Sequence, residues 1–161
     1  MRYRYTILYI ALIALVNYAF VIIPPITLPG GAIWPPVSLL VGFIFVARDF
    51  AQREVGHFVL VAMLIGAGIS WFMASPQIAI ASAAAFLISE VVDWAVYTIT
   101  KRPLSERILY SSALGTPVDS VVFLGLIGFL SPAAAIIQTA SKLIGAFIVW
   151  WMLRRREMAL A

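Results

Sequence analysis

Six apolar stretches dominate this chain, and they constrain its fold more than any other feature of the sequence. Each is close to the roughly 20 residues that an α-helix needs to cross about 30 Å of hydrocarbon. We therefore predict an all-α polytopic membrane protein, in which residues 1–161 form a single membrane domain, one bundle of six transmembrane helices. The predicted helices cover about residues 5–23, 32–47, 58–74, 77–99, 111–130 and 133–153.

The lysine and arginine residues alternate between the gaps that separate these stretches. Ten of the eleven lie in every second gap or beside a terminus, whereas the connections at 24–31, 75–76 and 131–132 carry no charge. Because cytoplasmic segments of membrane proteins are enriched in Lys and Arg, this pattern predicts that both termini are cytoplasmic. The ten are Arg2, Arg4, Arg48, Arg53, Lys101, Arg102, Arg107, Arg154, Arg155 and Arg156.

The composition excludes several classes of protein. Hydrophobic residues make up 63% of the chain and charged residues 11%, far from the roughly 25% charged residues of a soluble domain. The basic residues are spread over four short segments, so we expect no nucleic-acid partner. With no cysteine and a single histidine, His57, the sequence predicts no metal site and no cofactor. It also lacks a glycine-rich phosphate-binding loop, so we do not expect ATP hydrolysis.

Four charged residues lie inside the apolar stretches, and they are the first candidates for a functional site. They are Glu90, Asp93, Asp119 and Lys142. At 1.5 Å rise per residue, all four fall within a band of depth on the order of 10 Å. A charge near the centre of a membrane helix costs roughly 2.5–3.5 kcal/mol. We therefore expect these side chains to converge in a pocket sealed from lipid; the alternative is that Lys142 only ties two helices together.

Five segments of the chain carry a family resemblance. In order they are Pro35-Pro36-x-Ser38, Phe45-Val46-Ala47-Arg48-Asp49-Phe50-x-x-Arg53-Glu54-x-Gly56, Ser89-Glu90-x-x-Asp93, Val118-Asp119-Ser120-Val121-x-Phe123, and Lys142. This series resembles the VUT family of queuosine precursor (7-cyano-7-deazaguanine) transporters. The resemblance implies a six-helix importer of the bacterial inner membrane, not an enzyme, that salvages 7-deazaguanine bases.

The candidate residues suit such a ligand on chemical grounds. A guanine-like base presents an N–H and an NH₂ side by side, and a carboxylate can accept both hydrogen bonds at once. Any of the three carboxylates can do this, while Lys142 can donate to the ring carbonyl. Trp94 and Phe123 are candidates for stacking on the base, although aromatic residues more often fill a core or lie at a membrane interface.

A further charged group lies at the inner end of the second predicted helix. Asp49 and Arg53 are spaced i, i+4, and Glu54 follows directly. Such groups are commonly solvated surface pairs of little energetic consequence. The resemblance favours a second interpretation, in which these three residues form a cytoplasmic gate.

Two other functions stay open at this point. The chain could be the substrate-binding subunit of an energy-coupled vitamin uptake complex instead of a gradient-driven importer. It could also be an intramembrane aspartyl protease, with Asp93 and Asp119 sharing a proton, although it lacks the motifs that accompany such aspartates. The expected partners are a nucleobase-like small molecule and the lipid bilayer, and the sequence allows a homodimer as well as a monomer.

Overall fold

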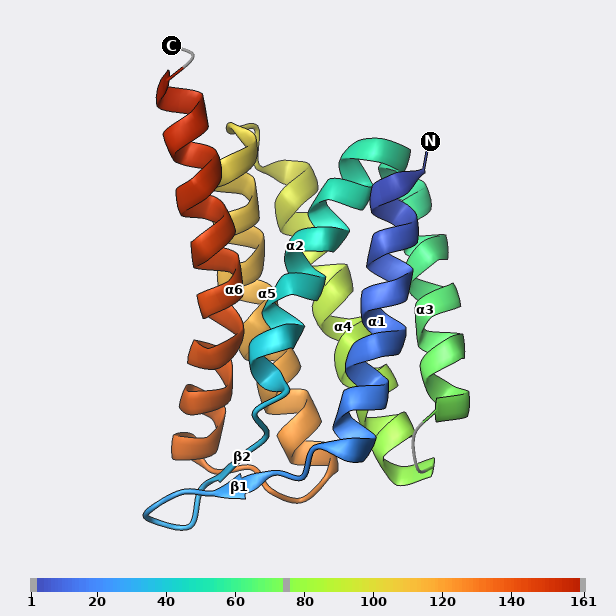
Figure 1. Ribbon diagram of the computed structural model, residues 1–161, viewed down its shortest axis with the longest axis vertical. Helices are drawn as coiled ribbons and strands as arrows, with labels where there is room; N and C mark the ends of the chain where they lie inside the picture. Colours follow the sequence, from blue (N-terminus) through green and yellow to red (C-terminus); the bar gives the residue numbers. More distant parts are fainter. Residues whose placement is uncertain (1–2, 74–75, 160–161) are drawn as a thin grey trace.

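The computed structural model describes residues 3–73 and 76–159, and this part of the chain is almost entirely helical (Figure 1). A 3-10 helix, η1 (Gly56–Phe58), joins α2 to α3, and the two strands β1 (Ile26–Thr27) and β2 (Ile33–Trp34) join α1 to α2. The predicted all-α class is confirmed apart from this short hairpin. The α-helices are α1 (Arg4–Ile22), α2 (Ser38–Val55), α3 (Val59–Met73), α4 (Pro76–Ile99), α5 (Leu104–Leu126) and α6 (Pro132–Ala159).

Five helical segments of the described chain are long and apolar enough to cross a membrane. They are Arg4–Ile22, Ser38–Phe72, Ile80–Ile99, Leu104–Leu126 and Pro132–Met158. The second is 35 residues long because it contains both α2 and α3, which turn back on each other at η1 (Figure 1). Gly56 ends α2 with φ +62°, a conformation that favours glycine, and so permits this reversal.

The helices pack pairwise in a closed ring. The neighbours around this ring are α1, α2, α6, α5, α4 and α3, and α3 returns to α1. Helix α2 also contacts α4 and α5 across the ring, and eleven of its 18 residues are buried. Large apolar side chains such as Leu64 and Phe72 of α3 stay exposed on the outside of the bundle, as expected for contact with lipid. The polar residues of α2 that are directed into the interior are Ser38, Arg48, Asp49 and Gln52.

The predicted bounds of three helices are wrong by more than two residues. Helix α2 begins at Ser38 rather than 32 and ends at Val55 rather than 47, α5 begins at Leu104 rather than 111 and ends at Leu126 rather than 130, and α6 ends at Ala159 rather than 153. Residues 32–37 include Pro35 and Pro36, whose missing N–H groups oppose helix formation. Three helix ends extend beyond the predicted bounds: the end of α2, the start of α5 and the end of α6. Hydropathy identifies only the apolar part of a helix, whereas Arg, Glu and Gln continue these helices beyond that part.

The hairpin between α1 and α2 lies at one end of the bundle (Figure 1). Ile26 pairs with Trp34 and Thr27 with Ile33, and the turn between them uses Gly30 at φ +93°. The Trp34 indole Nε1 donates to the Ser141 hydroxyl at 2.8 Å, so the hairpin is attached to α6. The first turn of α1 and the last turns of α6 lie at the opposite end.

The connection from α5 to α6, residues 127–131, also lies at the hairpin end (Figure 1). Ser131 caps α6, because its hydroxyl accepts a hydrogen bond from the Ala134 amide at 3.1 Å and Pro132 occupies the first turn. The predicted turn at residues 75–76 begins at Ser75, which lies outside the described residues.

Candidate functional site

A cavity of about 40 Å³ lies inside the helix ring. A single buried water needs a cavity of at least about 10–15 Å³. This cavity therefore has room for a few waters and is too small for a bicyclic base. It is lined by Ile13, Val16, Asn17 and Phe20 of α1, Val41 and Ile44 of α2, Ser82 and Phe86 of α4, Asp119 and Phe123 of α5, and Gln138 and Lys142 of α6.

An ion pair forms one wall of this cavity. The Lys142 ammonium donates to the Asp119 carboxylate and, at 3.1 Å, to the Ser120 hydroxyl. The Ser89 hydroxyl donates to Asp119 Oδ1 at 3.3 Å. Lys142 is 1% exposed and Asp119 7% exposed, so both charges are withdrawn from lipid and water. The pair is neutral as a whole, which makes its burial tolerable.

Gln138 lies one helical turn before Lys142 on α6 and faces the same cavity. Its side chain is 1% exposed, and neither its amide nitrogen nor its amide oxygen has a hydrogen-bond partner among the described residues. Because buried polar groups are nearly always hydrogen-bonded, such an amide is typical of a group that a ligand or water satisfies. Gln138 is not among the residues predicted for the site, although its i, i+4 spacing from Lys142 could have identified it.

The rest of the lining is aromatic and weakly polar. Asn17 donates from Nδ2 to the Ile13 carbonyl and the Ser70 hydroxyl, both at 2.8 Å, and accepts from Ser82 at 3.1 Å. The rings of Phe20 and Phe123 lie 5.9 Å apart at the edge of the cavity. The cavity therefore offers a charged wall, a free amide and aromatic faces, the combination that small-molecule sites use.

A second buried charged cluster is centred on Arg48 of α2, which is 1% exposed. Its Nε lies 3.2 Å from Glu90 Oε2, its Nη2 lies 2.9 Å from Asp93 Oδ2, and its Nη1 pairs with the adjacent Asp49. We call the residues bonded in this cluster the Arg48 network: Tyr9, Arg48, Asp49, Gln52, Glu90, Asp93 and Ser111.

Neighbouring helices supply neutral donors to this network. The Tyr9 hydroxyl of α1 donates to Glu90 Oε2 at 2.9 Å, and the Ser111 hydroxyl of α5 donates to Asp49 Oδ2 at 2.9 Å. Three carboxylates surround one guanidinium, so the network has a formal charge of −2 if all of them are ionised. A charge imbalance of this kind away from water is costly unless a proton or another partner reduces it.

The four charged residues predicted to converge fall into two groups. Asp119 and Lys142 line the cavity, whereas Glu90 and Asp93 bind Arg48, and all four are buried. Because Asp93 and Asp119 are each paired with a different cation, they do not form the shared-proton pair of an aspartyl protease.

The two predicted stacking residues also separate. Phe123 lines the cavity, but the Trp94 indole donates to His57 Nδ1 at 3.1 Å and is not among the cavity-lining residues.

The three residues predicted to form a cytoplasmic gate also lie apart. Asp49 is buried in the Arg48 network, Arg53 is exposed, and no ion pair joins them among the described residues. Glu54 instead accepts hydrogen bonds from the Thr6 amide at 2.9 Å and the Thr6 hydroxyl at 2.7 Å, and so caps the start of α1.

The sequence pattern predicts that Arg48 lies in a gap after the second helix, which is wrong, because the residue is buried inside α2. The helical spacing that connects Val41, Ile44 and Arg48 on one buried face could have identified it.

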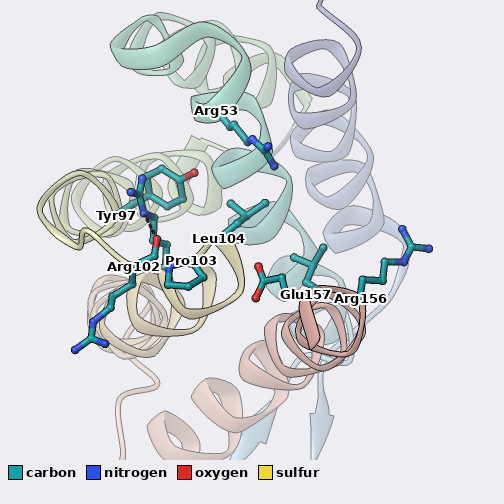
Figure 2. Close-up of a pocket in the computed structure, with 9 residues that line it drawn as sticks. Arg53, Tyr97, Arg102, Pro103, Leu104, Arg156 and Glu157 are labelled. Atoms are coloured by element: carbon teal, nitrogen blue, oxygen red, sulfur yellow. Dashed lines mark hydrogen bonds between the residues drawn. The ribbon is translucent and has the colours of Figure 1, made fainter. Parts of the chain in front are cut away.

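A larger pocket of about 690 Å³ opens at the end of the bundle where α1 begins and α6 ends (Figure 2). We call it the basic vestibule; Arg53, Tyr97, Arg102, Pro103, Leu104, Arg107, Leu153, Arg156 and Glu157 line it. Figure 2 shows the Arg102 and Arg156 side chains extending in different directions, while Glu157 points inward. The Tyr97 ring centroid lies 5.4 Å from Arg107 Cζ and 5.9 Å from Arg48 Cζ, so Tyr97 joins the vestibule to the Arg48 network.

Comparison with known protein families gives a match over most of the chain. A family model described as "Putative vitamin uptake transporter" matches residues 4–155, and so includes the cavity and the whole Arg48 network. No curated protein and no solved structure matches the chain.

Proposed function

Since the chain belongs to the vitamin uptake transporter family, as its resemblance to the VUT family predicted, we propose that it imports 7-deazaguanine bases across the bacterial inner membrane. Family membership gives the broader activity, uptake of a small molecule through a membrane. The substrate class, the orientation in the membrane and the driving force are parts of the proposal, and each rests on a separate observation.

The cavity between the helices is the observation that carries the proposed substrate class. The Asp119 carboxylate can accept both the N–H and the NH₂ of a guanine-like edge, and Lys142 can donate to the ring carbonyl. The free amide of Gln138 can both donate to and accept from a heterocycle. The flat faces of Phe86 and Phe123 suit a planar ring. A ligand with a planar donor–acceptor edge therefore fits this lining best.

The small volume of the cavity indicates a closed state. A bicyclic base enters or leaves only if helices move apart, as in transporters that expose a central site to each side in turn. We infer that binding expands the cavity and that release requires an opening toward one end of the bundle.

The distribution of charge supports six spans with both termini in the cytoplasm. The arginines of the basic vestibule lie at the end where α1 begins, whereas the hairpin end, residues 24–37, carries no charge. Cytoplasmic surfaces of membrane proteins are the ones enriched in arginine. On this assignment α2 and α3 each cross the membrane, and substrate enters from the hairpin side.

A gradient drives the proposed import, since the chain carries no phosphate-binding loop. The second candidate function is the substrate-binding subunit of an energy-coupled vitamin uptake complex, which the description of the matching family favours. Uptake by this chain alone, in a host that lacks coupling subunits, separates the two.

The test of the proposed function is uptake of radiolabelled 7-cyano-7-deazaguanine in cells that lack their own synthesis and salvage of this base. We expect uptake with the wild type and its loss with Asp119→Asn and Lys142→Met. Glu106→Gln, which removes a carboxylate outside the cavity, is the matched control and keeps wild-type uptake. No uptake by the wild type refutes the substrate class, and equal uptake by all four proteins refutes the site.

A further inference from the structure

The Arg48 network closes the cavity on the side of the basic vestibule. Three of its residues each lie four positions from a cavity-lining residue on the same helix, all toward the vestibule end. The Tyr9 ring also stacks with Phe86 of the cavity at 6.5 Å, while the Tyr9 hydroxyl binds Glu90. The three pairs of residues are Tyr9 and Ile13, Arg48 and Ile44, and Glu90 and Phe86.

The network also holds the helices together at this level. Arg48 joins α2 to α4 through Glu90 and Asp93. Tyr9 adds α1 and Ser111 adds α5, so four helices are bonded at one depth. Beyond the network, toward the vestibule, lies Tyr97. A base that passes from the cavity to the vestibule must therefore separate the bonds between α2 and α4.

Arg48 has carboxylate partners on α2 and on α4, and protonation affects the two sets of ion pairs differently. Asp49 is the neighbour of Arg48 on α2, so this pair stays together when α2 moves. Glu90 and Asp93 lie on α4, and a proton bound to either carboxylate removes a negative partner of Arg48 on that helix. Glu90 Oε1 and Asp93 Oδ1 have no hydrogen-bond partner among the described residues, so an oxygen that can accept a proton is present on each.

The charged and titratable groups around this position leave one guanidinium against three carboxylates. The guanidinium is Arg48 of α2, and the carboxylates are Asp49 of α2 and Glu90 and Asp93 of α4. Tyr9 of α1 and Tyr97 of α4 are neutral neighbours. The other nearby charges have partners of their own: Arg107 of α5 lies over the Tyr97 ring, and Lys142 of α6 pairs with Asp119. The three carboxylates that surround Arg48 are each at most 1% exposed. Uptake of a proton reduces this buried excess of negative charge, whereas loss of a proton restores the full ion pairs.

We propose that the Arg48 network is the inner gate of the transporter and the binding site of its coupling proton. A proton on Glu90 or Asp93 loosens the α2–α4 bonds, so the cavity opens to the vestibule. When the proton leaves to the vestibule side, the ion pairs re-form and the gate closes. This proposal rests on the transport function proposed above and assigns its coupling ion and the position of that ion.

The first test uses purified protein in lipid vesicles with labelled 7-cyano-7-deazaguanine. With a pH gradient of one unit, transport coupled to one proton can accumulate the base about tenfold. We expect the wild type and the control Glu106→Gln to accumulate the base. Glu90→Gln and Asp93→Asn lose accumulation but keep exchange of labelled for unlabelled base, because a neutral side chain leaves the gate free to open without a proton.

Different outcomes of this test would reject the proposed gate and the proposed transport function. Accumulation by Glu90→Gln and Asp93→Asn that equals the wild-type level overturns the gate while the proposed function stands. A wild type that neither exchanges nor accumulates the base refutes the proposed function itself. Loss of exchange in both variants leaves the decision to a second measurement.

This second measurement keeps the network intact and uses the absence of native cysteine. Ser112 is fully buried, lies next to Ser111 of the network and has no hydrogen-bond partner among the described residues. Because only the thiolate reacts and its fraction falls with pH, the rate for Ser112→Cys is divided by the rate for the exposed thiol of Lys101→Cys at the same pH. With a charged, membrane-impermeant reagent on the vestibule side, we expect this ratio to be higher at acidic than at neutral pH. An equal ratio at both pH values, or no reaction of Ser112→Cys at either, overturns the gate.

Discussion

Two glutamine side chains of the described chain are buried, and they are in opposite states. Gln52 accepts a hydrogen bond from Arg48 at 3.0 Å and donates one to Thr98 at 2.9 Å. Gln138 has no partner for either end of its amide among the described residues. A buried amide that is hydrogen-bonded stabilises a fold, whereas an unpaired one costs free energy that only a ligand or water recovers. We therefore expect Gln138 to serve binding rather than folding.

Substitution of each glutamine by leucine should separate these roles. Gln52→Leu removes two hydrogen bonds and is expected to lower the free energy of unfolding by about 1–3 kcal/mol. Gln138→Leu should leave stability unchanged or higher but raise the KM for uptake about tenfold or more, because it removes ligand contacts. Thermal unfolding in detergent and uptake kinetics measure the two effects. A Gln138→Leu variant that is destabilised with unchanged KM would show that this amide is structural.

The ion pair of Lys142 and Asp119 permits a test of another kind. Removing one partner leaves an uncompensated buried charge, so Lys142→Met and Asp119→Asn are each expected to cost about 3–5 kcal/mol of stability. The double variant removes both charges and should recover most of that loss, while uptake stays absent. Unfolding of the four proteins gives the coupling energy. Recovered uptake in the double variant would show that the Lys142–Asp119 pair only holds α5 and α6 together and does not bind substrate.

Helices α2 and α6 cross with their backbones in contact, and glycine makes this possible. A Cβ atom on Gly42 would overlap the Lys142 carbonyl, and one on Gly145 would lie 3.0 Å from the Gly42 carbonyl carbon. Close approach through small residues is the usual way in which membrane helices pack. The crossing also fixes the backbone of Lys142 and thereby the direction of its ammonium.

This crossing predicts a local sensitivity to added volume. Gly42→Ala should destabilise the bundle by about 1–3 kcal/mol, because α2 and α6 have to separate. Gly68→Ala in α3 is the matched control, since its added Cβ meets no atom within 4 Å among the described residues. Thermal unfolding of the two variants is the measurement. Equal unfolding temperatures would contradict the tight crossing.

Helix α1 is capped by a side chain from α2 rather than by its own residues. Glu54 accepts hydrogen bonds from the amides of Tyr5 and Thr6, which are among the unpaired donors of the first turn. A negative charge is favourable at this helix end.

Glu54→Ala is expected to speed hydrogen exchange of the amides in the first turn of α1 while uptake continues. Hydrogen exchange followed by mass spectrometry measures this directly. Loss of uptake without faster exchange would instead favour the gate role that the sequence indicated for Glu54.

The whole bundle is polarised along its axis. The hairpin end is uncharged, the basic vestibule occupies the other end, and the cavity and the Arg48 network lie in between. In the proposed transport function, substrate meets the cavity, the Arg48 network and the vestibule in succession, and the two ends of the bundle face opposite sides of the membrane.

This polarity predicts which positions each side of the membrane can reach. The chain has no native cysteine, so single cysteines report position without background. An impermeant thiol reagent should label Thr27→Cys in intact cells, and Lys101→Cys only after the membrane is permeabilised. The reverse pattern would invert the orientation, and labelling of both in intact cells would contradict an odd number of spans between residues 27 and 101.

Much of the fold followed from the sequence because it depends on local composition. Hydrophobic runs of the length of a membrane span identified the helices, and the alternation of arginine with uncharged turns predicted their orientation. The burial of Glu90, Asp93, Asp119 and Lys142 was predicted for the same reason, since charges within such runs are rarely left facing lipid.

The grouping of the charges depended on the packing of the helices. Helix α2 packs beside α6 in the ring and reaches across it to α4, and both are distant in sequence, so Arg48 meets Glu90 and Asp93 while Lys142 pairs with Asp119. The order of helices around a bundle and the rotation of each helix result from contacts between distant segments, such as the crossing at Gly42. The hydropathy pattern does not depend on those contacts and cannot predict them. For this reason the charged residues form two groups where one was predicted.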